Sequence, residues 1–144
     1  MVNDEQVASL RAFLALEPDE GVRLTKDLLQ AGDVDGYGEL IYAAFVIAVR
    51  RHFNPTWTIP DLIRLVAAIR GRLLADEVEI DPRVTETLMR RALGDAVTGE
   101  LDEEARARAQ IFVLFDLILD EDLDDTELDE FLAMARTMAD QLVD

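Results

Sequence analysis

The feature that most constrains the fold is an apolar run of ten residues at positions 40–49, followed directly by Arg50 and Arg51. A bilayer span needs roughly 20 apolar residues, so this run is too short to cross a membrane. A helix that is apolar on nearly every side is buried on most sides in a globular protein. The run therefore predicts a buried core helix over about residues 37–53.

A second, densely apolar block lies at positions 111–119, interrupted only by Asp116. It ends a helix that the pattern predicts over about residues 102–120. Because both blocks are apolar on most sides, we expect the third and sixth helices of the chain to form its buried centre. Phe45 and Phe115 are the expected core aromatics.

Helix-start signals recur along the rest of the chain, whereas the alternation typical of strands is scarce. Thr58 with Asp61 and Asp124 with Glu127 have the spacing of capping boxes, and Asp81 precedes Pro82. The pattern adds helices at about residues 4–16, 18–31, 59–75, 82–93 and from 124 or 125 onward. We therefore predict an all-α fold, a single-domain bundle of about seven helices over residues 1–144.

The charge of the chain is uneven. The net charge is −17, yet residues 50–91 carry eight arginines against six acids, and residues 92–144 carry three basic and sixteen acidic residues. A concentrated negative charge repels itself in a compact state. We expect the acidic last third to lie against the arginine-bearing segment, although the sequence leaves open whether it is instead an interaction surface.

Groups suited to catalysis are few. The chain has one histidine and no cysteine, and Ser9 and Lys26 are its single serine and lysine. Neither lies in a nucleophile elbow or a glycine-rich phosphate loop. The sequence therefore predicts a protein that is not an enzyme, with no catalytic residue and no cofactor.

Two acidic loops have some of the spacing of calcium loops. If Gly36 is the sixth position of such a loop, then Ala31 and Tyr42 occupy the positions that need carboxylates. In the loop that begins at Asp120, Phe131 replaces the required glutamate. We expect no specific metal site.

The same composition argues against several partners. Neutralisation of phosphates dominates binding to nucleic acids, and an overall charge of −17 opposes it. The first residues are acidic, where a signal peptide would be basic. The sequence predicts a soluble, acidic, cytoplasmic protein that binds neither nucleic acid nor membrane.

Two groups of residues are candidate sites. The first is a pocket for an anionic or planar ligand near the end of the third helix, formed by Arg51, His52, Trp57 and Arg64. Its alternative is structural, with Trp57 as a hydrophobic staple and His52 beside the negative end of the helix dipole. The second is a narrow seam on the last helix that would meet a partner or a second copy, or else pack on the domain itself; it consists of Leu128, Phe131, Ala135, Met138 and Leu142.

These observations favour a non-enzymatic interaction or regulatory protein whose partner is another protein or a second copy in a homodimer. One alternative is a small-ligand-binding helical domain with its pocket near His52 and Trp57. Another is an acidic inhibitor, of the immunity or antitoxin kind, that covers a basic site on its target. The salt dependence of binding would separate the last two, because only the inhibitor relies on charge.

Overall fold

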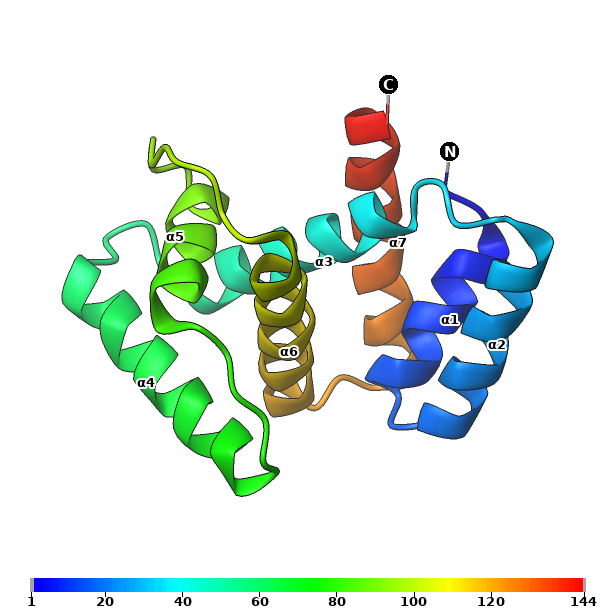
Figure 1. Cartoon of the computed structure of the whole chain (residues 1–144), viewed down its shortest axis with the longest axis horizontal. Helices are drawn as coiled ribbons and strands as arrows, with labels where there is room; N and C mark the ends of the chain where they lie inside the picture. Colours follow the sequence, from blue (N-terminus) through cyan, green and yellow to red (C-terminus); the bar gives the residue numbers. More distant parts are fainter. Residues whose placement is uncertain (1, 144) are drawn as a thin grey trace. The chain divides into compact units, whose positions relative to one another are not determined.

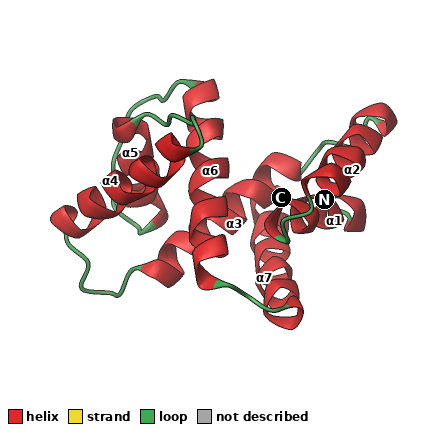
Figure 2. Ribbon diagram, turned by 90° about the horizontal axis from the view of Figure 1, so that it is seen from below, coloured by secondary structure: helices red, strands yellow, loops and turns green. Residues whose placement is uncertain are grey.

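The structure is a computed structural model that describes residues 2–143, and this part of the chain contains helices and no strands (Figures 1 and 2). The helices are α1 (Asp4–Leu14), α2 (Pro18–Ala31), α3 (Tyr37–His52), α4 (Ile59–Ala75), α5 (Pro82–Ala92), α6 (Glu103–Glu121) and α7 (Asp125–Val143). The all-α prediction and its seven helices are confirmed. None of the helices within residues 2–143 is both long and apolar enough to cross a bilayer.

Most helix ends lie where the local signals placed them. Thr58 and Asp61 form a complete capping box at α4, and the Asp81 carboxylate accepts from the backbone N–H groups of Arg83 and Val84 at α5. One capping box was missed in the sequence, between Asn3 and Gln6 at the start of α1. Such boxes satisfy helix N–H groups that have no partner inside the helix.

The end of α1 differs from the prediction. This helix ends at Leu14 rather than near residue 16, because Leu16 has a left-handed backbone with φ of 61°. A left-handed residue cannot continue a right-handed helix. The turn that it makes leads directly into Pro18 at the first position of α2.

Contacts divide the chain into two compact units. Unit 1 comprises Met1–Ala44 and Ile118–Asp144, and unit 2 comprises Phe45–Leu117. The division falls inside α3 and inside α6. The expectation of one domain over residues 1–144 stays a prediction.

In unit 1, α1 packs on both α2 and α7. The approach of α1 to α2 is close at Gly21, where an added Cβ would lie 2.9 Å from the ring of Phe13. A hydroxyl cluster joins three helices nearby: Ser9 Oγ lies 2.8 Å from Thr25 Oγ1 and 2.7 Å from the hydroxyl of Tyr37. Ser9 is fully buried, so the cluster satisfies a polar side chain inside the core.

Gln6 is the second buried polar side chain of unit 1. Its Nε2 donates to the backbone carbonyls of Asp33 and Asp35, at 3.0 and 2.9 Å, while its Oε1 accepts from the N–H of Asn3. Asn3 Nδ2 also donates to the carboxylate of Asp33 at 2.7 Å. The start of α1 therefore holds the loop that joins α2 to α3.

Unit 2 has an apolar core. The second half of α3 contributes a run from Phe45 to Val49 in which every residue is buried, and α4, packed beside α5, contributes Leu62, Val66 and Ile69. Its buried polar residue is Thr85, whose hydroxyl donates to the Asp81 carbonyl one turn back in α5. Apolar packing forms this core, while arginines at its edge join elements: Arg50 Nε donates to the Ala92 carbonyl at 2.8 Å, and Arg72 bonds to Asp116.

The two helices expected to form the buried centre, α3 and α6, differ in how much of their surface is buried. In α3 the apolar run is buried as predicted, but in α6 only one side is, with Val113 and Leu114 inside and Phe112 and Phe115 half-buried. An acid interrupts the apolar block. Only 10% of the Asp116 side chain is exposed, and its carboxylate pairs with Arg72 at 2.7 Å, which compensates for its burial.

The expected pairing of the acidic last third with the arginine-bearing segment holds only in part. Asp116 meets Arg72 in unit 2, as expected. In unit 1, however, Asp129 and Asp125 of α7 pair with Arg11 of α1, at 2.7 and 3.3 Å. Charge compensation for α7 thus comes from the first helix, which sequence segments alone did not indicate.

Candidate functional site

The predicted ligand pocket is only partly assembled in the structure. His52 and Trp57 each lie near Phe53, with ring centroids 5.2 and 6.3 Å from it, so three aromatic rings follow one another around the end of α3. The guanidinium of Arg64 instead bonds to Asp61 in the first turn of its own helix, at 2.6 Å. Arg51 and His52 are exposed at the last turn of α3. The ligand site at these residues stays a prediction.

Most of the predicted seam on α7 is not available at the surface. Leu128, Phe131 and Ala135 are buried, Met138 is half-buried and Leu142 is 50% exposed. This distribution agrees with the second interpretation of the seam, packing within the chain, because α7 contacts α1. Partner binding by this seam stays a prediction, and only its last two residues have surface to offer.

The single serine is held in a structural role. Its hydroxyl contacts two other hydroxyl groups, those of Thr25 and Tyr37, and neither is a base. Burial raises the pKa of Tyr37 above its ordinary value, while its hydrogen bonds to Ser9 and Thr25 act in the opposite direction. Tyr37 is therefore neutral at physiological pH and accepts or donates a hydrogen bond without titrating.

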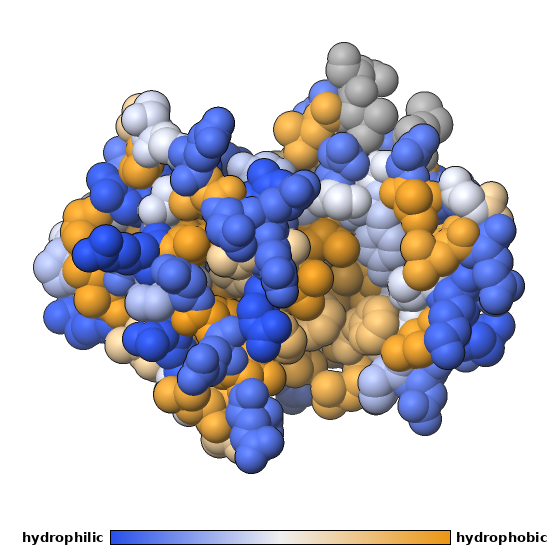
Figure 3. Space-filling model, viewed as in Figure 1, coloured by the Kyte–Doolittle hydropathy of each residue, from blue (hydrophilic) through white to orange (hydrophobic). Residues whose placement is uncertain are grey.

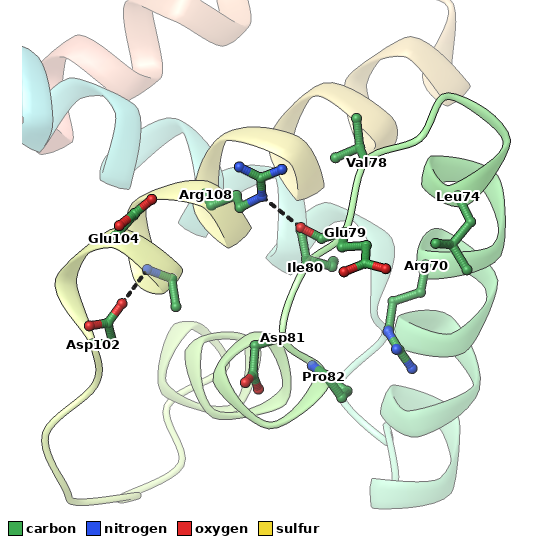
Figure 4. Close-up of a pocket in the computed structure, with 11 residues that line it drawn as sticks. Arg70, Leu74, Val78, Glu79, Ile80, Asp81, Pro82, Asp102, Glu104 and Arg108 are labelled. Carbon is green, nitrogen blue, oxygen red and sulfur yellow. Dashed lines mark hydrogen bonds between the residues drawn. The ribbon is translucent and has the colours of Figure 1, made fainter.

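A cleft of about 620 Å³ lies in unit 2 between the α4–α5 connection and the start of α6 (Figure 4). Arg70 and Arg108 lie on its walls with Glu79, Asp102 and Glu104. Several of its polar groups already hold the fold. Arg108 Nε donates to the Glu79 carbonyl at 2.6 Å, and the Asp102 carboxylate caps α6 at the Ala105 N–H.

These bonds leave little of the cleft pre-arranged for a ligand. Asp81, also on its wall, caps α5. The guanidinium of Arg108 lies 5.6 Å from the ring centroid of Phe112, which fixes it further. The cleft is thus mainly the place where two helix starts are capped.

A smaller groove lies in unit 1, with a volume of about 280 Å³. We call it the acid-rimmed groove; its walls are Leu14, Ala15, Leu16, Ile118, Leu119, Asp122, Leu123, Asp125 and Leu128. Buried leucine and isoleucine side chains form its floor. Leu16 and Leu119 are exposed at 69% and 42%, and the carboxylates of Asp122 and Asp125 stand on the rim.

A third surface is the outward face of α4. Its exposed apolar side chains, Ile59, Ile63 and Leu74, lie roughly a quarter turn around the helix from the buried Leu62, Val66 and Ile69. We call the exposed set the α4 outer face; apolar surface is visible in this part of the molecule among charged side chains (Figure 3). The missed signal was the second series of apolar residues, spaced by four at positions 59, 63 and 67.

No sequence motif predicts the acid-rimmed groove, because its walls come from two segments far apart in the sequence, residues 14–16 and 118–128. The one local signal was an acidic stretch at residues 120–125, which contains five acids. The reciprocal bonds between Asp124 and Glu127 confirm the capping box that the sequence predicts there. No protein-family model matches this chain, and neither a curated protein nor a solved structure is significantly similar to it.

Proposed function

We propose that this protein is a non-enzymatic interaction protein that binds another protein through the α4 outer face. The observation that supports the proposal is that α4 is apolar on two sides roughly a quarter turn apart, and one of these sides is exposed. A helix at the surface of a globular protein needs a single apolar face to pack. Exposed, contiguous apolar residues that the fold does not use are typical of a protein interaction site.

The charges on this face agree with the proposal. Arg64 and Arg70 are the charged side chains among its exposed residues, and Arg64 is held in position by Asp61. Arginine is enriched in protein interfaces, where its flat guanidinium pairs with carboxylates or stacks on rings. Ala67 and Gly71 are small and exposed, so a partner backbone can approach the middle of the helix closely.

A role for the α4 outer face in binding would also explain why position 63 is apolar, which the stability of the helix does not require. Ile63 is 47% exposed and follows the capped first turn of α4, where a polar residue would serve the helix equally well. Burying such a side chain in an interface gains about 1.5–3 kcal/mol. The outer face therefore combines apolar residues with arginine, both of which are found in protein interfaces, and Arg70 lies between Ile63 and Leu74 along the helix.

The test is affinity purification from source cells with three parallel baits: the wild-type protein, Ile63→Gln and the control Ala68→Gln. Ala68 is exposed on the same helix and carries no large apolar side chain. A captured protein is then purified and its binding measured by calorimetry. We expect Ile63→Gln to weaken the complex by about tenfold or more, with an unchanged melting temperature.

The control decides the interpretation. Ala68→Gln should bind as the wild type does, since it leaves the isoleucines and the arginines in place. Equal weakening by both substitutions, or none by Ile63→Gln, would show that the α4 outer face does not bind the partner.

A further inference from the structure

We infer that the acid-rimmed groove of unit 1 is a docking site for a basic, amphipathic helical segment of a partner protein. This surface is separate from the α4 outer face. Either one can fail in experiment without the other.

The first observation is the conformation of Leu16. It is a bulky residue with φ of 61°, a region that such residues rarely occupy, and it is also 69% exposed. Asparagine or glycine would adopt this backbone more easily and would expose no apolar surface. Leu16 therefore destabilises the unbound fold in two ways, through its backbone conformation and through its exposed apolar side chain. That side chain lines an apolar groove.

The second observation is the size and lining of the groove. Sites for small molecules usually occupy about 300–1,000 Å³ and enclose most of their ligand. The groove has about 280 Å³ and is bordered by two exposed leucines, Leu16 and Leu119. A few apolar side chains from one face of a helix match this volume better than a whole small molecule does. Amphipathic helices bind apolar grooves in this way.

Charge selects the occupant. Asp122 and Asp125 stand on the rim, and within residues 2–143 Asp122 makes no ion pair, whereas Asp125 shares Arg11 with Asp129. The chain as a whole carries −17. A basic segment is attracted by both the rim and the summed field. The same field would repel a second copy of this chain, a nucleic acid and an anionic membrane.

The probe is a synthetic helical peptide of leucine and lysine, with its leucines on one face, titrated into the full-length protein by calorimetry. We expect saturable one-to-one binding that weakens as salt is added. Leu16→Asn should lower the affinity for the peptide by at least about tenfold. The same substitution should leave the melting temperature unchanged or raise it, because asparagine relieves the strained backbone. If Leu16 only supported the fold, its substitution would lower the melting temperature.

Matched controls distinguish binding in the groove from attraction by the overall negative charge of the protein. Leu29→Asn removes another exposed leucine of unit 1, one that lies outside the groove, and should leave the affinity unchanged. Asp122→Asn should lower the affinity for the peptide by about twofold to fivefold. Glu130→Gln alters the net charge equally at an exposed site outside the groove, and should have a smaller effect.

Three results would overturn the inference. The first is wild-type affinity in Leu16→Asn, or equal weakening by Leu29→Asn, because the peptide would then be held by charge alone. The second is an absence of saturable binding to the wild-type protein. The third is micromolar self-association in analytical ultracentrifugation that Leu16→Asn abolishes, which would make a second copy the occupant.

Discussion

The two units bury polar groups in different ways. In unit 1, Gln6 and Ser9 are buried and bond to residues 16 to 29 positions away, so their bonds join separate helices and a loop. In unit 2, the buried Thr85 bonds to a carbonyl four residues back in its own helix. A bond between elements fixes their register, whereas a bond within a helix does not. The fully buried polar side chains of unit 1 therefore fix how its elements meet, whereas in unit 2 this role falls to arginines outside the core, such as Arg50 and Arg72.

The surfaces differ in a parallel way. The candidate surface of unit 1 is an apolar groove with carboxylates on its rim, and that of unit 2 is a helix face that carries exposed apolar residues and arginines. Opposite charges at two apolar surfaces would let one small chain discriminate between two kinds of partner.

The largest expected effect tests the apolar core of unit 2. Phe45→Ala should lower the free energy of unfolding by about 3–5 kcal/mol, since Phe45 is fully buried. Phe115→Ala should cost clearly less, because Phe115 is only half-buried. Chemical denaturation of both variants measures the difference. Equal losses would mean that α6 is as buried as α3.

The next effect compares the polar bonds of the two units. Gln6→Leu should lower the free energy of unfolding by about 1–3 kcal/mol, because it leaves the Asp33 and Asp35 carbonyls without their donor. Hydrogen exchange should also rise in residues 32–36.

Thr85→Val is the matched substitution in unit 2. The Asp81 carbonyl keeps its bond from the Thr85 N–H at 3.0 Å, so the loss should stay below about 1 kcal/mol. If Thr85→Val proved as costly as Gln6→Leu, the contrast between the two units would be wrong.

A smaller effect is expected at high pH, in the hydroxyl cluster of unit 1. Burial first of all raises the pKa of Tyr37, so the folded state holds this proton more tightly than the unfolded state does. The resulting stability is present below the unfolded pKa of about 10 and is lost as the pH rises through the folded value. Ser9→Ala should raise the pKa of Tyr37 further, because a hydrogen bond that lowers it is removed.

Ultraviolet titration measures this shift, with Tyr42→Phe as the background so that Tyr37 alone is observed. Tyr37→Phe should remove its part of the stability loss above pH 10. A pKa of Tyr37 that falls in Ser9→Ala would contradict the arrangement of the cluster.

The smallest effect concerns the cap of α4 in unit 2. Hydrogen bonds from Thr58, and then from Arg64, lower the pKa of Asp61 below its ordinary value. The stability that this carboxylate contributes is present above its unfolded pKa and is lost as the pH falls through the folded value. The difference in melting temperature between the wild type and Asp61→Asn should therefore shrink on acidification below about pH 4. A difference that is independent of pH would mean that the charge on Asp61 plays no part in the cap.

The sequence by itself determined the helices of this protein and most of their ends. Caps such as Thr58 with Asp61, and the proline that follows Asp81, act over three or four residues, so local chemistry is sufficient to predict them. The apolar run at positions 40–49 also predicted its own burial, because no exposed arrangement of that helix is stable.

Only the tertiary structure decided which surfaces remain uncovered. Periodicity tells which residues of a helix are apolar, but which of them are covered depends on neighbours that the sequence does not identify. Apolar residues at helical spacing are exposed on the α4 outer face, whereas the seam residue Phe131, in a similar pattern, is buried. The acid-rimmed groove brings together residues more than 100 positions apart, and it depends on a left-handed turn at Leu16 that no local propensity favours. Such sites arise from packing between distant elements, where the free energy is set by the fit of whole helices rather than by residue type.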